Sequence, residues 1–466
     1  MPLTSGAQTA ALVFGAITNV LYARLLAPAQ IGHFAIAVAA ATGIVVVADG
    51  GLQLFLTRAI ARKETGPGAG SSVLLVVLPA NVLLVWLVAM AGLAVLSSIW
   101  GLSIAPNTLL LVLELALSLV LYQAGLTLYQ GLGWFRGRAA LLVWNGVATM
   151  VATVAALTVE RSVSAAVYAT AVAYFAVGVA ALVPVLRRYG LVRVPVSDVR
   201  HWFRCARGLW LNACLGYVTS SADVLLAALV LPIGVVGLYQ VFKKLALVAL
   251  SPLSVVLPLV YAHLAPADRS SRSSFVRRLE IASAGAIALG LLIAAPYLRA
   301  IIGALFGTIY AHHVPILLAL VAIGAVQFSH NLLGYVCAAA GEFYRPLWMN
   351  VCVAGSGTVL ALGLGSEMGV YGFLVGLAVG NMLGLVLGLA FTSRLLDRRA
   401  RLAALVAAAS VLAATTIAYA LFWVPLMLGA VIGAASAAAG AAIVGRLLGR
   451  PGWLARKTSP IAARTS

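Results

Sequence analysis

Long apolar runs, separated by short breaks that carry proline, glycine or charge, follow one another along nearly all of this 466-residue sequence. A helix of about 20 apolar residues crosses the roughly 30 Å hydrocarbon core of a bilayer. Because that core offers no water to backbone groups, only helices and closed barrels span it, and unbroken apolar runs exclude a barrel. The sequence therefore predicts an all-α polytopic membrane protein with about 14 transmembrane helices.

Composition supports this class, because 63% of the residues are apolar and only 9% are charged, too few charges to cover a soluble surface of this size. The first predicted break between spans is at Leu26-Ala27-Pro28. The predicted spans are 5–27, 30–57, 72–97, 107–131, 138–159, 163–186, 208–231, 235–262, 279–298, 315–340, 346–366, 369–393, 402–423 and 425–446.

Arginine and lysine collect in every second connection, for example at Arg58, Arg136 and Arg269. By the positive-inside rule, these connections and both termini are expected on the cytoplasmic side of the cell (inner) membrane. The longest of them, 187–207, is expected either to lie on the inner membrane surface or to form an ordered loop away from lipid. Anionic lipid headgroups then explain the net charge of +19, and no nucleic-acid partner is expected.

A weak internal repeat relates two parts of the chain. Leu26-Ala27-Pro28 with Gly32 recurs, one residue longer, as Leu231-Pro232 with Gly237. Both motifs lie at outer turns six spans apart, and this even offset predicts parallel repeats about an axis along the membrane normal, unless the turns match by chance. The predicted division is 1–190 for spans 1–6, 191–400 for spans 7–12, 401–446 for an extra helix pair and 447–466 for a basic cytoplasmic tail.

Ionisable residues inside spans cost roughly 2.5–3.5 kcal/mol each at the bilayer centre, so each needs an explanation. The clear cases are Arg24, Asp49, Glu114, Asp223, Lys243 and Lys244. We predict that the cations Arg24, Lys243 and Lys244 line a cavity and bind a phosphate-bearing substrate, Arg as a bidentate fork and Lys as a point charge. The carboxylates are candidates for coupling or for charge pairs.

A purely structural explanation stays open for the same residues. With a rise of 1.5 Å per residue, Asp223 and Lys243 both lie about 12 Å below their shared turn, where an ion pair is available. Glu114 would then pair with Arg24, and Lys244 would extend to the outer surface. Asp49 precedes Gly50-Gly51, so it either binds a coupling ion or proton or stabilises a helix break.

The remaining patterns carry no catalytic chemistry. Five glycines at fourfold spacing predict close helix packing: Gly372, Gly376, Gly380, Gly384 and Gly388. His330 is a lone histidine, so neither a metal site nor a cofactor is expected. The outer connections are short and hold isolated carboxylates such as Glu160 and Glu367, so we expect no enzyme activity.

Several motifs in order resemble the polysaccharide-biosynthesis flippases of the multidrug/oligosaccharidyl-lipid/polysaccharide exporter superfamily. The likeness covers roughly residues 20 to 395 and leaves the last two spans as an addition, which is seen in members with 14 spans. One departure is Val224, where the family often has a basic residue after Asp223, and this moves the expected phosphate contact to Lys243, Lys244 and Arg24. The matching motifs are Ala23-Arg24-Leu25-Leu26-Ala27-Pro28 with Gly32 and Phe34, Asp49-Gly50-Gly51-Leu52, Asp223, Gly237-Leu238-Tyr239 with Lys243-Lys244, Leu305-Phe306-Gly307, Gly341-Glu342 and Gly369-Val370-Tyr371-Gly372.

This resemblance implies two six-helix lobes, related by a pseudo-twofold axis along the membrane normal, that open alternately to each side. The implied activity is flipping of a lipid-linked (polyprenyl pyrophosphate) oligosaccharide for cell-surface polysaccharide assembly. Its implied partners are membrane lipid, that substrate and membrane proteins of polysaccharide assembly, with coupling to a proton, a cation or the membrane potential. Two alternatives stay open: a cation-coupled multidrug exporter, whose cavity would favour carboxylates, and a non-transporting membrane scaffold, whose charges would be paired in dry packing.

Overall fold

The computed structural model describes residues 2–100, 106–253, 268–342 and 344–423, with the isolated positions 260, 264, 435 and 438. Every regular element within these ranges is a helix. Nine of the described helices are long and apolar enough to cross a membrane, or ten if one bent pair is counted as a single span. The protein is therefore a multi-pass membrane protein. We call the end of the bundle that carries the basic connections the inner end, and the opposite end the outer end.

The chain divides into two runs of helices. The first run is α1 (Pro2–Leu25), α2 (Pro28–Asp49), α3 (Leu52–Ala61), α4 (Pro67–Ser72), η1 (Val73–Val77), α5 (Leu78–Trp100), α6 (Pro106–Gly131), α7 (Phe135–Val159) and α8 (Val163–Tyr189). The second run is α9 (Val196–Ser220), α10 (Asp223–Val230), α11 (Ile233–Ala249), α13 (Arg269–Phe306), α14 (Thr308–Ala311), α15 (Val314–Ala339), α16 (Tyr344–Phe391) and α17 (Arg398–Phe422).

The predicted spans up to residue 423 fall on described helices, except that residues 254–259, 261 and 262 of the span 235–262 lie outside the described residues, as does the last span, 425–446. The spans predicted at 346–366 and 369–393 are the two arms of α16, which bends back at Gly369, where φ is 63°. The span predicted at 30–57 is divided into α2 and α3 at Gly50 and Gly51, both in the left-handed region. Glycine adopts this conformation without the steric penalty of a Cβ atom.

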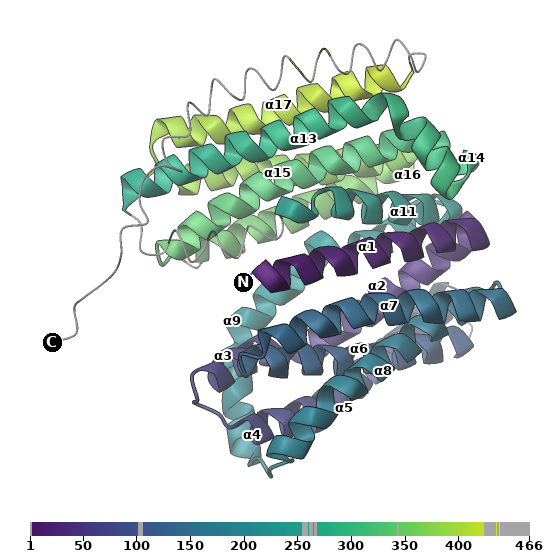
Figure 1. Ribbon diagram of the computed structural model, residues 1–466, viewed down its shortest axis with the longest axis vertical. Coiled ribbons are helices and arrows are strands. Elements are labelled where there is room, and N and C mark those ends of the chain that lie inside the picture. The colour runs from purple at the N-terminus through teal and green to yellow at the C-terminus, as the bar shows by residue number, and fades with distance from the viewer. Residues whose placement is uncertain are drawn as a thin grey trace.

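The two runs form two groups of helices that lie side by side (Figure 1). The first group packs through α1 with α7 and α6 with α8, and the second through α13 with α17 and α15 with α16. The groups meet where α2 packs on α11, and α9 crosses between them at the inner end. This is the two-lobe arrangement that the sequence predicted.

The basic connection predicted at 187–207 is not a loop throughout, because α9 already begins at Val196. This helix packs on the break between α2 and α3, where a Cβ atom at Gly51 would lie 2.6 Å from the Ala206 carbonyl oxygen. A Cβ atom at Gly50 would clash with the ring of Phe203. The two glycines therefore serve both the break and the close approach of α9.

The glycine ladder packs the two arms of α16 against each other. A Cβ atom at Gly380 would lie 2.6 Å from the Cα atom of Gly357, and one at Gly376 would clash with the backbone of Ala361. Small residues at such a crossing let two backbones approach closely, which favours van der Waals packing where lipid supplies no hydrophobic driving force. The predicted packing role of the ladder is confirmed.

Replacing Gly376 with valine should lower the free energy of unfolding by at least about 1–3 kcal/mol, because the clash is with backbone that cannot rotate away. Thermal unfolding of the purified protein in detergent measures this loss. Gly363→Val is the matched control, since a Cβ atom at Gly363, in the other arm of α16, meets nothing within 4 Å. An equal loss in both variants would contradict the packing role.

Candidate functional site

The two predicted repeat motifs lie against each other at the outer end, where they form what we call the outer seam: Pro28 and Gly32 of α2 with Ile233 and Gly237 of α11. A Cβ atom at Gly237 would clash with the Pro28 carbonyl oxygen, and one at Gly32 would clash with the Ile233 carbonyl oxygen. The two lobes therefore touch backbone to backbone, which only glycine permits at this separation.

Two further contacts tie α1 to the second lobe. The Arg24 guanidinium donates to the carbonyl oxygens of Leu305, at 2.8 Å, and Ala304, at the C-terminal end of α13. The Asn19 amide donates to the Val241 carbonyl oxygen in α11 at 3.2 Å. An arginine at a helix C-terminus satisfies carbonyl groups that lack a helical partner and complements the helix dipole. In this structure the lobes are joined at their outer ends.

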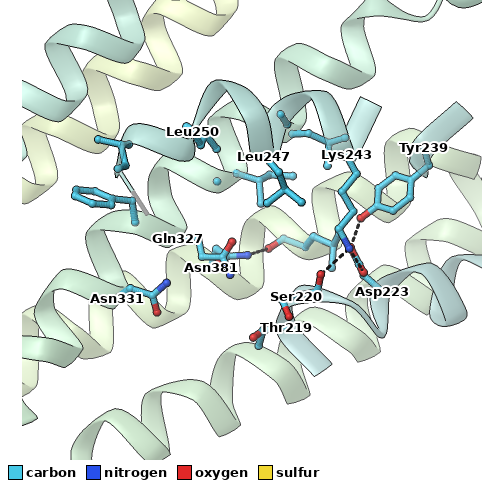
Figure 2. Close-up of a pocket in the computed structure, with 17 residues that line it drawn as sticks. Thr219, Ser220, Asp223, Tyr239, Lys243, Leu247, Leu250, Gln327, Asn331 and Asn381 are labelled. Carbon is cyan, nitrogen blue, oxygen red and sulfur yellow. Dashed lines mark hydrogen bonds and ion pairs between the residues drawn. The ribbon is translucent and has the colours of Figure 1, made fainter. Parts of the chain in front are cut away.

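Asp223 and Lys243 form an ion pair on the second lobe (Figure 2). Lys243 Nζ lies 2.5 Å from Asp223 Oδ1 and donates to the Ser220 carbonyl oxygen at 2.7 Å. The Tyr239 hydroxyl donates to the other carboxylate oxygen, Oδ2. The side chains of Lys243 and Asp223 are only 14% and 8% exposed, so the two form a largely buried ion pair, as the structural explanation of the sequence allowed. The turn 231–232 and the helical rise bring the two residues to the same depth.

This ion pair borders a cavity of about 190 Å³ inside the second lobe, between α9, α10, α11, α15 and α16. A second cavity of about 250 Å³ lies beside it and shares Asn331. Together they place amide, hydroxyl and imidazole groups along the lobe. The polar side chains that line them are Thr219, Ser220, Asp223, Tyr239, Lys243, Gln327, Asn331 and Asn381 in the first cavity, and Asn212, His330, Asn331, Tyr335 and Asn350 in the second.

Lys244, the next residue, contacts the first lobe instead. Its Nζ lies 5.8 Å from the ring centroid of Tyr22 and 5.7 Å from that of Phe34. The Tyr22 ring is fixed because its hydroxyl hydrogen-bonds to Thr153 and Thr170. No described carboxylate lies within ion-pair distance of Lys244. Lys244 is therefore a partly buried cation at the boundary between the lobes, stabilised by aromatic faces.

The other predicted site residues are dispersed. Arg24 and Glu114 do not pair, because Arg24 binds α13 and Glu114 is exposed on α6 without an ion pair to any described residue. Asp49 is 8% exposed, and its carboxylate accepts from the Gln53 backbone N–H at 3.1 Å. The structure thus shows Asp49 stabilising the start of α3, and leaves a coupling role for it untested.

One buried carboxyl group escaped the sequence analysis. Glu280 of α13 is 0% exposed and accepts a hydrogen bond from Ser329 Oγ of α15 at 2.8 Å. It was overlooked because it lies at the edge of the predicted span 279–298, two residues after Arg278, where a carboxylate would be solvated. The helical spacing could have predicted this burial. Glu280 lies on the same face of α13 as four small or apolar residues that are all buried: Ser273, Val276, Ser283 and Ala284.

Comparisons with known proteins agree with this fold. The lipid II flippase MurJ in an inward closed conformation superposes with a TM-score of 0.69 at 12% identity, covering 96% of this chain and 99% of MurJ. A multidrug resistance MATE family transporter of the MOP superfamily, in its inward-facing conformation, superposes with a TM-score of 0.62 at 14% identity, covering 83% of this chain and 94% of that one.

A third solved structure is a MOP superfamily transporter from Pyrococcus furiosus, for which reverse polarity of the binding pocket is said to suggest a different function. It superposes with a TM-score of 0.53 at 15% identity, covering 84% of this chain and 94% of that one. No curated protein matches the chain in sequence. The sequence profile of the family described as "Polysaccharide biosynthesis protein" matches residues 3–267. Since that match covers more than half of the 466 residues, the chain belongs to the family of polysaccharide biosynthesis proteins.

Proposed function

We propose that this protein flips a lipid-linked, polyprenyl pyrophosphate oligosaccharide from the inner to the outer leaflet of the cell membrane by alternating access. The observation that carries this proposal is Lys244, a cation between the lobes that has no carboxylate partner among the described residues. In the proposed orientation both termini are cytoplasmic, and the inner membrane surface supplies the substrate.

The chemistry of a pyrophosphate fits this position. A pyrophosphate group carries several negative charges and needs cations with free hydrogen-bond donors, which an ammonium group on an aromatic face retains. Lys243 and Arg24 have their donors directed to Asp223 and to carbonyl oxygens in this structure, so they would join the substrate only after the lobes move. The polar lining of the two cavities offers hydrogen bonds to sugar hydroxyl groups.

The contacts at the outer end fit one state of an alternating-access cycle. The outer seam and the bond from Arg24 to α13 join the lobes on the outer side, so a substrate between the lobes would have to enter from the inner side. Rocking of residues 1–190 against 191–400 would then separate the seam and release the substrate outward.

Replacing Lys244 with alanine should lower the flipping rate at least about tenfold, since one lost charge-assisted contact is worth about 1.5–3 kcal/mol. Lys244→Arg should retain part of the activity, because it keeps the charge and the contact with the rings. The measurement is the amount of surface glycan, together with lipid-linked oligosaccharide accumulated on the inner leaflet, in cells that carry only the variant.

Arg299→Ala provides the matched control, because Arg299 is an exposed cation on α13 outside the predicted site. Normal surface glycan with Lys244→Ala would remove this lysine from the mechanism. Two other outcomes would favour the alternative functions. If the variant lost resistance to cationic drugs while surface glycan stayed normal, the protein would be a multidrug exporter. If a variant that cannot transport still restored surface glycan, the protein would be a scaffold.

A further inference from the structure

Glu280 is the most buried of the described carboxyl groups and forms no ion pair with any described residue. It is 0% exposed, whereas Asp223 has Lys243 as its partner and Asp49 binds a backbone N–H. Its Oε2 atom receives the hydrogen bond from Ser329, and its Oε1 atom has no partner among the described residues. A charged carboxylate in such surroundings is disfavoured, so burial without a counter-ion favours the protonated form of Glu280.

The described helices that pack around Glu280 supply no counter-ion. On α15, Ser329 faces it, while the next residue, His330, lies against Gly384 of α16. On α17, the sequence between Arg401 and Tyr419 contains no ionisable side chain. The helices α1 and α14 reach α13 near its outer end, where Arg24 binds the last carbonyl groups.

The nearest cations lie one turn away, toward the inner end. Ser273 Oγ accepts from the Asp397 backbone N–H at 2.9 Å, which sets the register between α13 and α17. In that register Arg277 and Arg401 each lie about one helical turn below Glu280, and neither forms an ion pair with it. A Glu280 carboxylate without its proton would attract the Arg401 guanidinium group, and because Arg401 is on α17, bringing the two together would shift α13 relative to α17.

A small void lies on the outer side of Glu280. Its volume is about 10 Å³, at the lower limit of what one water molecule needs, and its polar lining is Ser283 and Ser329. The Ser329 hydroxyl suits both protonation states, because it donates to a carboxylate and accepts from a protonated carboxyl group.

The same helix connects Glu280 to the outer end. Helix α13 runs over 38 residues with Pro296 inside it, and the carbonyl groups that bind Arg24 begin 24 residues beyond Glu280, about 36 Å along the axis. A movement of α13 at Glu280 that passes Pro296 would change the contact that joins the two lobes. Burial without a counter-ion, nearby guanidinium groups and this link to the other lobe are independent observations, and they point to one function.

We propose that Glu280 is a proton-binding site whose loss of a proton to the inner side shifts α13, breaks the contact with Arg24 and favours opening of the outer end. The step is the transfer of one proton from the carboxyl group to water, which leaves a carboxylate. This proposal rests on the proposed transport function, since it names the coupling ion and the residue that binds it.

The test follows the separation of the lobes without any substrate. Cysteines that replace Glu160 and Glu367, two exposed positions at the outer ends of the two lobes, carry the spin labels. We call the distance between these labels the outer distance. It is measured by pulsed electron paramagnetic resonance in lipid nanodiscs. The four native cysteines are replaced beforehand. In the otherwise unchanged protein, the ratio of long to short outer distances should rise at least about fivefold between pH 5 and pH 9, because charging the buried site penalises the closed state.

In Glu280→Gln, which mimics the protonated group, the outer distance should stay short at every pH. Glu64→Gln, at an exposed carboxylate in an inner connection, is the matched control and should keep the full pH response. A pH response retained in Glu280→Gln, or no pH response in the unchanged protein, would overturn the proposal. So would a response that follows sodium concentration and not pH, which would indicate a metal cation instead.

If size-exclusion chromatography shows that Glu280→Gln does not fold, Ser329→Ala is the second variant that tests the proposal. Removing the donor to the carboxylate should move the midpoint of the pH response up by about one unit, and an unchanged midpoint would contradict the proposal. The distance measurement uses no oligosaccharide, so its result does not depend on the surface-glycan measurement in Lys244→Ala. A pH response with normal glycan in Lys244→Ala would reject the proposed substrate contact and keep the proton site.

Discussion

Gly237→Val is expected to abolish export and to leave the outer end open. The valine side chain would occupy the space of the Pro28 carbonyl oxygen, and that oxygen belongs to the first turn of α2, which cannot rotate aside. Overpacking of this kind costs about 1–3 kcal/mol or more, so the closed population should fall roughly ten- to a hundredfold. The outer distance should therefore be long at every pH, and surface glycan should be lost although the protein still inserts in the membrane.

Gly234→Val is the matched control on the same helix. A Cβ atom at Gly234 would lie 3.9 Å from the Ala29 backbone nitrogen, an ordinary contact. Export in this variant should stay within about twofold of the unchanged protein, because surface or loosely packed substitutions rarely exceed a few tenths of a kcal/mol. If Gly237→Val exported normally, the outer seam would not be a closing contact.

The second large effect is expected at the ion pair of the second lobe. Asp223→Ala leaves the Lys243 ammonium group buried without its partner, and breaking a buried pair in this way typically costs about 3–5 kcal/mol. We expect a large fall in thermal stability in detergent, or failure of the protein to accumulate. The double variant Asp223→Ala, Lys243→Ala should recover most of that stability, because no uncompensated charge remains.

The double variant also separates a structural role of Lys243 from a substrate role. We expect it to be stable but unable to export, because Lys243 is one of the cations predicted to contact the pyrophosphate. Recovery of both stability and export would instead assign the pair to structure alone. Asp198→Ala, at an exposed carboxylate near the start of α9, is the control and should change neither quantity.

Much of the architecture could be predicted because it depends on local rules. The membrane spans follow from apolar length, and the break at Gly50-Gly51 and the bend at Gly369 follow from residues that alone accept a positive φ without strain. The depth match of Asp223 and Lys243 follows from one tight turn and a constant helical rise. These inferences need no knowledge of which helices become neighbours.

The rest depends on neighbours far away in sequence. Adjacent residues on a helix point about 100° apart, so Lys243 and Lys244 had to face different surroundings, but the sequence alone could not assign the aromatic rings of the first lobe to Lys244. Arg24 binds carbonyl groups of α13, a partner 280 residues further along the chain, instead of Glu114. Burial of Glu280 likewise depends on α15 and α17, which no local pattern around residue 280 reveals.

The outer seam has a further consequence, because its contacts are reciprocal. Gly32 of the first motif meets the residue after Pro232 of the second, and Gly237 of the second meets Pro28 of the first. These contacts resemble the isologous interface of a twofold homodimer, in which one surface patch serves as its own complement. One half of this protein would thus carry both of the surfaces that meet at the outer seam. If such a half were duplicated and fused, its two copies would already pack against each other at this position, without a newly evolved surface.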